Sequence, residues 1–391
     1  MSPFALGTLA GSLLVITLAL VVRGRFYAIF AGVLLTIQGS IACQLFPYTG
    51  ALAPLFVVLH VSVYLNLLSL VWARLRTLPF RLLVSWPGAF FAAGTFVAFP
   101  WAIASGFGVT LKYVWVPYLV AALGFIDTWR PRFSIVRLVL DGLDAGPLAR
   151  FRSVHRDHER PLRVAQLTDP HLGPFQSPDR LRRIVERIVA TKPDLVMLTG
   201  DFLTMESHRA EAELAYALEP LRALPGRAFA CRGNHDHEAP KTVARALASA
   251  GVTLLIDEAT NVDTEAGRVQ VVGLDFHFRD RNEKMSRALA AHPREPGALR
   301  LVLLHDPGAF KHLPDGDADL VLSGHTHGGH IGFVSLGLSA TVVSLFSKVP
   351  DHGPWSLGKN RLYVHRGTGH YGFPIRLGVP AEESVLEVIW G

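Results

Sequence analysis

The N-terminal third of the chain contains no acidic residue between Met1 and Ile126, and only six basic ones. Four uncharged apolar runs occupy residues 4–22, 26–46, 51–72 and 82–104. Each run is long enough to cross the hydrocarbon of a bilayer, since about 20 helical residues suffice. A fifth run, 113–126, is shorter, and its tryptophans suit an interfacial anchor. Residues 1–128 are therefore predicted to form an α-helical transmembrane domain of four or five spans.

Two features of this region allow a second interpretation. The first run could be a cleaved signal peptide, but such a peptide begins with basic residues, and here Arg23 and Arg25 follow the run. We therefore expect a retained signal anchor or a true span. His60 lies within the third run, where a histidine either bonds to a neighbouring helix or serves a proton or metal site. We expect the packing role.

The arginines of this region indicate a topology. They cluster after the first, third and fifth runs, whereas the connection 44–50 carries none. Positive residues favour the cytoplasmic side of a membrane. With five spans, the N-terminus lies outside and the C-terminal domain lies in the cytoplasm; with four spans, that domain faces outward. We expect a multi-pass protein of the cell's inner membrane whose C-terminal domain is cytoplasmic.

The formal net charge of +6 would ordinarily suggest nucleic acid as a partner. The six basic residues before position 127 account for all of this excess, because 32 basic and 32 acidic residues remain after it. We therefore expect no nucleic-acid partner, and we expect membrane lipids around the apolar third. Cys43 and Cys231 are compatible with a reducing compartment.

The rest of the chain consists of a short connection and a regular pattern. Residues 129–160 are predicted to be a linker or edge segment, in which 133–143 forms either an edge strand or an interfacial helix. Residues 161–391 alternate strand-like runs with helical periodicity, which predicts a layered α/β domain. The strand-like runs are 162–167, 194–199, 227–232, 268–274, 299–304, 318–323 and 361–366, and the helical segments are 179–190, 212–224 and 242–250.

Polar residues gather directly after five of these strands. They are Asp169 and His171, Asp201, Asn234 to Asp236, His305, and His325 with His327. Ligands of α/β sheets gather at the carboxyl ends of strands. Imidazoles mixed with carboxylates suit Mn, Fe or Zn better than Ca, and two such ions about 3.5 to 4 Å apart can clamp a phosphoryl group. The sequence therefore predicts two divalent metal ions, and glycines beside the ligands are expected to let phosphate oxygens approach the backbone.

Five motifs follow one another in a fixed order. They are D-x-H at 169–171, G-D at 200–201, G-N-H-D at 233–236, a lone His305 after a strand, and G-H-x-H at 324–327. In this order they resemble the calcineurin-like metallophosphoesterase superfamily. The stretch 366–382 resembles its bacterial membrane-associated subgroup, typified by YkuE and YaeI. The resemblance implies a metallophosphoesterase domain over 161–391, with the four-layer α/β/β/α sandwich of that superfamily.

The resemblance also implies roles for single residues. Asp169, His171, Asp201 and His327 would bind one metal ion, and Asp201 would bridge to a second ion held by Asn234, His305 and His325. His235 would stabilise or protonate the leaving group, and Asp236 would orient His235. Two departures from the superfamily pattern are Pro170 and His330, and His330 either adjusts the site or lies on the surface.

The uncharged segment 331–346 follows the last metal motif. A sixth span is excluded by its position, because the domain could not close around a membrane crossing. We expect a buried loop; the alternative is an apolar lip beside the site that receives an acyl chain or rests on the bilayer.

These features predict a membrane-anchored dinuclear metal-dependent phosphoesterase. It would hydrolyse a phosphodiester or pyrophosphate bond by metal-hydroxide attack, in a lipid or lipid-linked phosphoester substrate. The alternatives are hydrolysis of soluble nucleotides or phosphoproteins at the membrane, and a non-catalytic metal-binding membrane scaffold. A scaffold would be indicated by lost metal ligands or a lost motif histidine, and none is lost here.

Overall fold

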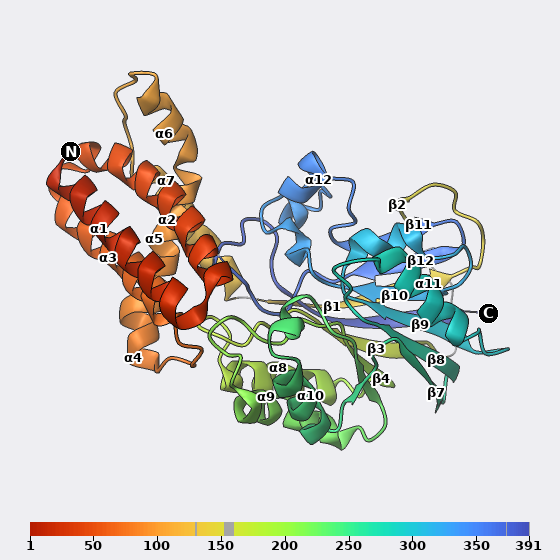
Figure 1. Ribbon diagram of the computed structural model, residues 1–391. Helices are drawn as coiled ribbons and strands as arrows, with labels where there is room; N and C mark the ends of the chain where they lie inside the picture. Colours follow the sequence, from red (N-terminus) through yellow and green to blue (C-terminus); the bar gives the residue numbers. More distant parts are fainter. Residues whose placement is uncertain (130, 152–159, 373, 391) are drawn as a thin grey trace.

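The computed structural model of the chain describes residues 1–129, 131–151, 160–372 and 374–390. A helical bundle, residues 3–128, packs beside a two-sheet domain built from the rest (Figure 1). The bundle consists of α1 (Pro3–Leu18), η1 (Ala19–Arg23), α2 (Arg25–Leu45), η2 (Phe46–Tyr48), η3 (Gly50–Leu52), α3 (Ala53–Ser69), α4 (Leu78–Phe80), η4 (Arg81–Ser85), α5 (Trp86–Val97), α6 (Phe99–Gly106) and α7 (Val116–Thr128).

Four helical stretches of the bundle are long and apolar enough to cross a membrane. They are Pro3–Arg23, Arg25–Tyr48, Gly50–Ser69 and Leu78–Val97. Helix α7 is apolar but has only 13 residues. The packing role expected for His60 agrees with its contacts, because its ring nitrogens lie 3.0 Å from Thr8 Oγ1 and 3.2 Å from Gln38 Nε2, on two neighbouring helices.

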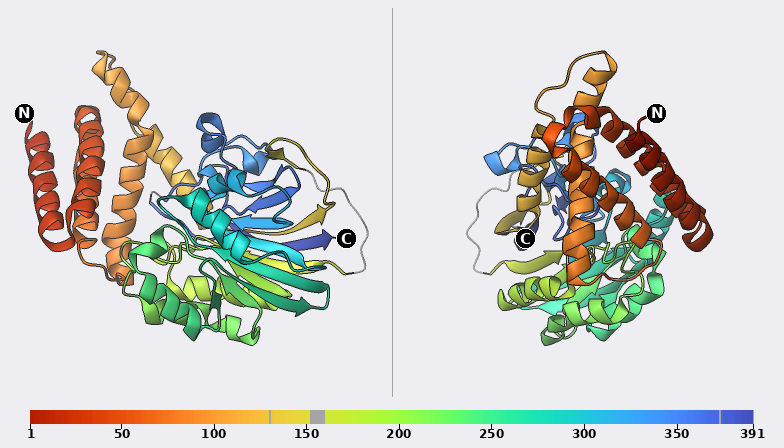
Figure 2. Two further views of the ribbon diagram at one scale, coloured as in Figure 1. Left: turned by 45° about the vertical axis from the view of Figure 1, so that its right-hand side comes forward. Right: turned by 90° about the vertical axis from the view of Figure 1, so that its left-hand side faces the viewer.

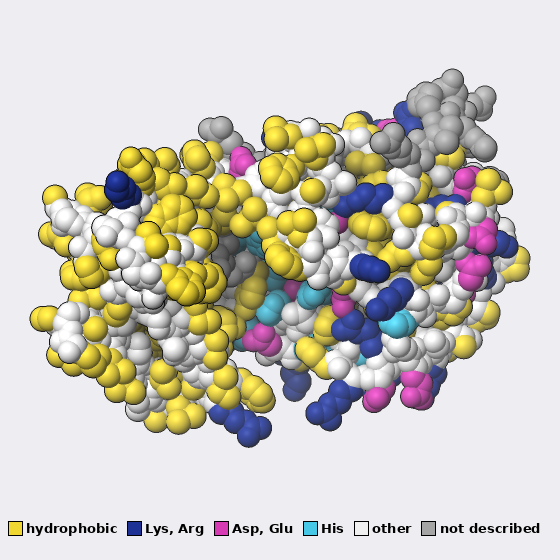
Figure 3. Space-filling model, turned by 90° about the horizontal axis from the view of Figure 1, so that it is seen from above, with side chains coloured by type: hydrophobic (Ala, Val, Ile, Leu, Met, Phe, Trp, Pro, Cys, Tyr) yellow, Lys and Arg dark blue, Asp and Glu magenta, His cyan; other side chains and the backbone are white. Residues whose placement is uncertain are grey.

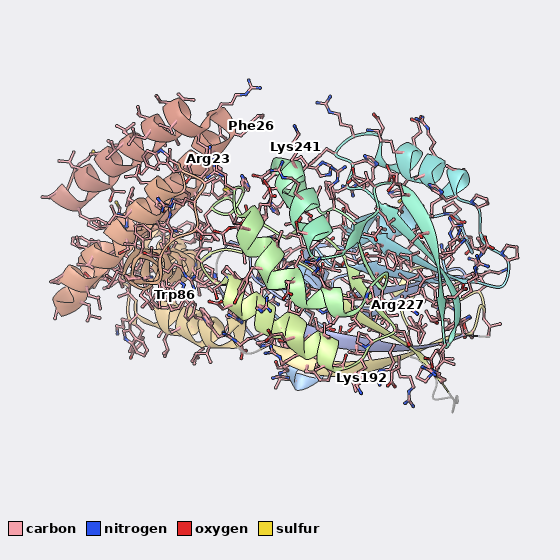
Figure 4. All side chains as sticks on the ribbon, turned by 90° about the horizontal axis from the view of Figure 1, so that it is seen from below. Arg23, Phe26, Trp86, Lys192, Arg227 and Lys241 are labelled. Carbon is pink, nitrogen blue, oxygen red and sulfur yellow. The ribbon has the colours of Figure 1, made fainter. Side chains whose placement is uncertain are left out.

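One end of the bundle carries most of its arginines and also contacts the two-sheet domain. The chain reaches this end after α1, leaves it in α2, returns after α3, leaves it in α5 and returns after α7 (Figure 2). Arg23 donates to the carbonyl of Met205 at 2.9 Å, and Trp86 Nε1 donates to the carbonyl of Pro174 at 2.9 Å. Figure 4 shows Arg23 and Trp86 on the side of the bundle that faces the two-sheet domain.

The two-sheet domain contains one six-stranded and one seven-stranded sheet. The first has the order β1 (Arg132–Leu140), β13 (Glu382–Trp390), β3 (Leu162–Leu167), β4 (Leu195–Leu198), β5 (Ala228–Ala230) and β6 (Thr253–Leu254). The second has the order β2 (Ala149–Arg150), β11 (Gly353–Leu357), β12 (Asn360–Val364), β10 (Leu320–Ser323), β9 (Leu299–Leu304), β8 (Gly267–Leu274) and β7 (Glu258–Thr264). Strands β3 to β6 are mutually parallel, and so are β8, β9, β10 and β12.

Three apolar layers hold the sheets and helices together. In β3, Val164 points into the core between the sheets, whereas Ala165 and Leu167 point to the helices on the outer face, as the two-residue period of a strand requires. Helices α8 (Pro178–Ala190), α9 (Glu211–Leu218) and α10 (Pro240–Ser249) cover that face, and α11 (Arg281–Ala291) with η7 (Pro307–His312) covers the second sheet. The four-layer α/β/β/α arrangement is confirmed.

All seven strand-like runs of the sequence contain strands of this domain. The choice left open for 133–143 is decided in favour of a strand, because β1 pairs in parallel with β13 at the edge of the first sheet. Strand β13 itself was not predicted, since its acidic start, Glu382 and Glu383, obscures the pattern. Both of these carboxylates are buried, and Glu383 pairs with Arg187.

The segment 331–346 is exposed, so the expectation of a buried loop is wrong. Leu336, Leu345 and Phe346 are 75%, 72% and 86% exposed. The backbone explains this, because Gly332 and Ser335 donate to the carbonyls of Leu377 and Gly378 and so hold the segment on the outside of the domain. It contains η9 (Val334–Leu336) and α12 (Val342–Phe346), and Figure 3 shows hydrophobic side chains gathered in this region, beside the bundle. We call residues 331–346 the apolar lip.

Gly124 of α7 packs closely against residues 375–377. A Cβ there would meet Ile375 Cγ2 at 2.5 Å, whereas a Cβ at Gly106 of α6 would meet nothing within 4 Å. We expect Gly124→Val to cost about 1 to 3 kcal/mol through overpacking. Thermal unfolding of the detergent-purified protein should show a lower Tm for Gly124→Val and an almost unchanged Tm for Gly106→Val. Equal shifts in the two variants would contradict this contact.

Candidate metal centre

The carboxyl ends of five strands from both sheets meet at one edge of the domain. Strands β3, β4 and β5 contribute from the first sheet, and β9 and β10 from the second. Because the strands are parallel within each sheet, their carboxyl ends face the same way and bring distant parts of the sequence together. Figure 3 shows histidines in a depression between the bundle and the sheets. The side chains predicted as ligands fall into two groups there.

The first group consists of Asp169, His171 and His327, all buried. Their ligand atoms lie within 4.8 Å of one another. His171 Nε2 is 3.8 Å and His327 Nε2 is 3.5 Å from Asp169 Oδ1. These three side chains surround a common point, as ligands of one ion must.

The second group consists of Asp201, His305 and His325. His305 Nε2 lies 3.2 Å from Asp201 Oδ2 and 3.2 Å from His325 Nδ1. The same Asp201 Oδ2 is 3.7 Å from His171 Nε2 of the first group. Asp201 therefore stands between the groups, in the position of a shared carboxylate ligand.

Two further atoms fit a metal site. Within the described residues, His171 Nε2 and Asn234 Oδ1 are buried and have no hydrogen-bond partner. A buried polar atom without a hydrogen-bond partner costs free energy, and a bound metal ion would supply the missing partner. The donor set of imidazoles, carboxylates and one amide oxygen suits Mn, Fe or Zn, so the residues present fit two divalent ions.

The backbone is strained where the ligands leave the strands. Five of the seven predicted ligands have positive φ: Asp169 (50°), His171 (45°), Asp201 (57°), His325 (68°) and His327 (50°). Residues other than glycine seldom adopt this region, and such strain persists where the surrounding structure imposes it, often at functional sites. The sharp turns allow side chains directly after each strand to point into one site.

The motif glycines make room for the ligands themselves. A Cβ at Gly324 would lie 2.2 Å from Asp169 Oδ2, and a Cβ at Gly233 would lie 2.2 Å from Asp201 Oδ1. A side chain at either position would therefore collide with a ligand carboxylate, and the approach of phosphate oxygens to these glycines stays a prediction.

Burial and neighbouring charges set the protonation of the ligands. Burial lowers the pKa of His171 to about 3 and that of His325 to about 4, so both imidazoles are neutral near pH 7, as metal ligands must be. Burial raises the pKa of Asp169 to about 6, with Asp201 adding to the rise and His305 opposing it. For His305, burial is outweighed by the Asp201 carboxylate, which raises its pKa to about 10.

His235 lies beside the first ligand group, but Asp236 does not orient it. The Asp236 carboxylate instead accepts hydrogen bonds from the backbone N–H groups of Asp201, Phe202 and Gly233 at 2.7 to 2.9 Å. It therefore supports the turn that carries Asp201, and its expected role is corrected. His235 Nδ1 is held by Glu238 Oε1 at 3.0 Å. Burial would lower the pKa of His235, but this hydrogen bond and Asp201 raise it.

Three residues at the site were not found from the sequence: Glu238, Tyr371 and Arg376. The ring of Tyr371 lies 4.2 Å from that of His235 and 4.8 Å from that of His171. Fully buried Arg376 places Nη2 3.2 Å from His327 Nδ1. Glu238 lies two residues after the G-N-H-D motif, and its spacing of three residues from His235 is the one signal in the sequence for this pair.

The remaining histidines singled out in the sequence have different places. His330 is half-buried beside the ligands, since its ring stacks 5.1 Å from that of His327 and its Nδ1 contacts the carbonyl of Ile375. His277 pairs with Asp257 at 2.8 Å, which agrees with a structural role. His237 lies 3.2 Å from Asp275.

Comparison with known proteins gives the following relatives. Residues 162–329 match the sequence profile described as calcineurin-like phosphoesterase. Phosphodiesterase YaeI of Escherichia coli is 29% identical over 243 residues, covering 60% of this chain and 84% of the relative. The uncharacterized metallophosphoesterase YkuE of Bacillus subtilis is 28% identical, covering 58% of this chain and 78% of its own. UDP-2,3-diacylglucosamine pyrophosphatase LpxG of Chlamydia muridarum is 25% identical, covering 70% and 95%.

Among solved structures, the NAD nucleotidase of Haemophilus influenzae is similar, with 16% identity and a TM-score of 0.37. The matched residues cover 54% of this chain and 51% of that protein.

Replacing single residues should separate metal binding from turnover. We expect His235→Ala to lower kcat by about 10² to 10⁴, the range for losing an acid–base group, while the metal content stays unchanged. Asp201→Ala should lose both metal and activity, because this carboxylate stands between the two ligand groups. Metal analysis and an assay with bis-p-nitrophenyl phosphate measure the two effects. Loss of metal in His235→Ala would contradict the assignment.

Proposed function

We propose that this chain, which belongs to the calcineurin-like metallophosphoesterases through residues 162–329, hydrolyses a phosphodiester or pyrophosphate bond of a lipid or lipid-linked substrate at the membrane. The observation that carries the proposal is the pair of ligand groups joined by Asp201, at the edge of the sheets that lies beside the bundle. The profile match and the relatives confirm the family resemblance seen in the five sequence motifs.

The chemistry divides between the ions and the side chains. Two divalent ions held by these ligands would polarise a phosphoryl group and lower the pKa of water enough to supply hydroxide near neutral pH. Glu238 holds Nδ1 of His235, which leaves Nε2 to donate a proton or a hydrogen bond to the leaving oxygen. Tyr371 packs on the His235 ring and limits its rotation.

A polar cleft beside the site fits the phosphate-bearing part of a substrate. The cleft has a volume of about 640 Å³, and its lining includes His325, Thr326, Lys311, the ion pair of Arg281 with Asp306, and Val343 of the apolar lip. Figure 3 shows Lys and Arg side chains in this part of the surface. Cations near the ligand groups favour an anionic substrate.

Three observations favour a lipid over a soluble nucleotide or phosphoprotein. The bundle has four helices apolar enough to cross a membrane. The exposed apolar lip lies close to the bundle, because its backbone is bonded to Leu377, and Ile375 and Leu377 pack against α5 and α7. The relatives include proteins named as pyrophosphatases of a diacylated sugar nucleotide. The scaffold alternative is disfavoured, since six of the seven predicted ligand side chains gather in the two groups.

The path of the chain through the bundle supports five membrane segments and a cytoplasmic catalytic domain. The arginines lie at the end of the bundle that contacts the catalytic domain, and α7 brings the chain back to that end. By the preference of positive residues for the cytoplasm, this end faces inward. The N-terminus lies at the far side of the bundle (Figure 1).

The reaction class is tested with the detergent-purified full-length protein. We expect hydrolysis of bis-p-nitrophenyl phosphate with Mn²⁺, loss of activity with EDTA, and recovery when Mn²⁺ is returned, because no side chain replaces the Lewis acid. Absence of turnover while two ions are bound would favour the metal-binding scaffold.

The apolar lip should matter for lipid substrates only. We expect replacement of Phe333, Leu336 and Phe346 by Ser to spare bis-p-nitrophenyl phosphate hydrolysis and to slow turnover of a vesicle-bound lipid pyrophosphate at least several-fold, since contact with the bilayer is lost. Leu143→Ser, an exposed leucine outside the lip, is the matched control. An equal fall for both substrates would contradict a lipid-specific role.

A further inference from the structure

A cavity of about 210 Å³ lies between the bundle and the catalytic domain. Helices α2, α3 and α5 form one wall with Phe30, Leu34, Val63, Leu67, Ala89 and Ala92. Three loops of the catalytic domain, at 174–175, 204–206 and 370–372, form the other wall. The cavity is therefore bounded by the apolar helices on one side and by segments next to the metal centre on the other.

The two walls differ in polarity. The helix residues deeper in the bundle offer only hydrocarbon, whereas polar groups stand where the helices meet the catalytic domain. Within the described residues, several polar atoms of the cavity wall are buried without a hydrogen-bond partner. They are Asn66 Oδ1, Ser85 Oγ and both carboxylate oxygens of Glu206. Burial raises the pKa of Glu206 to about 7, although Arg76, through its charge and nearby backbone amide, and Arg81 lower it. Buried polar atoms without partners are costly, and the polar groups of a bound molecule would supply partners to them.

Tyr371 connects the cavity to the metal centre. Tyr371 lines the cavity, and its ring also packs against those of His171, a predicted ligand, and His235. The wall formed by the helices includes Phe30, which is 43% exposed. The cavity is thus lined both by a partly exposed side chain of the bundle and by a residue that packs against the metal centre.

We propose that this cavity binds a hydrocarbon chain of the substrate, with the phosphate at the metal centre and the linking hydroxyl or ester groups beside Asn66, Ser85 and Glu206. The apolar helix wall, the polar groups of Asn66, Ser85 and Glu206, and the metal centre would match the hydrocarbon chain, the linker and the phosphate of a membrane lipid. This inference rests on the proposed phosphoesterase activity and assigns its substrate a binding site formed jointly by the bundle and the catalytic domain.

A series of alkyl p-nitrophenyl phosphates tests the site. Hydrolysis releases p-nitrophenolate from each member, and only the length of the alkyl chain, from methyl to octyl, differs. For the wild-type protein we expect kcat/KM to rise by up to about fourfold for each methylene that enters the cavity, as burial of a CH₂ group implies.

Filling the cavity should abolish this gain. Ala89→Phe places a ring in the cavity, so kcat/KM should become nearly independent of chain length, whereas turnover of the methyl ester stays near the wild-type value. Ala10→Phe makes the same change at an exposed position of α1, outside the cavity, and should keep the wild-type dependence on chain length.

Two results would overturn the inference while leaving the phosphoesterase activity standing. One is a dependence on chain length in Ala89→Phe equal to that of Ala10→Phe. The other is a flat dependence in the wild-type protein. If the wild-type protein with Mn²⁺ did not hydrolyse even the methyl ester, the proposed function itself would fail, and the cavity would lose its assigned role with it.

Discussion

The burial of two carboxylates among histidines is the constraint on which this structure depends. Asp169 and Asp201 are almost completely buried, and the nearest imidazole nitrogens lie 3.2 to 3.8 Å away. Burying ionised groups costs free energy unless they are paired or coordinate metal. Three features hold these carboxylates at the strand ends. The backbone amides of His325 and His235 donate to them, the turns with positive φ direct them inward, and Gly233 and Gly324 leave room for them.

The sequence was sufficient for the fold class and for most of the site, for a physical reason. The buried parallel strands are apolar runs, and five of them, β3, β4, β5, β9 and β10, end at a predicted ligand, so the order of strands and polar residues carried the information. The wrong or missing predictions concern residues whose position depends on contacts with distant parts of the sequence. Asp236 is one residue from His235, but its carboxylate turns toward the amides of Asp201 and Phe202, which the sequence places more than 30 residues away. Tyr371 and Arg376 reach the site from a loop without any ligand pattern.

The apolar lip is a second case in which contacts distant in the sequence decide the outcome. An uncharged run is typical of a buried segment, but burial depends on whether a neighbouring layer covers it. Here both sheets already have their helices, and the backbone of 331–346 is tied to 377–378 at the rim. The bundle lies next to that rim, so the lip, the cavity and the metal centre adjoin one another. This arrangement links the apolar third of the chain to the phosphoesterase chemistry.

Anomalous X-ray scattering from crystals of the full-length protein grown with Mn²⁺ would show whether the two ligand groups joined by Asp201 hold two ions. We expect two peaks, one among Asp169, His171 and His327 and one among Asp201, His305 and His325. A single peak, or ions bound away from these side chains, would contradict this expectation.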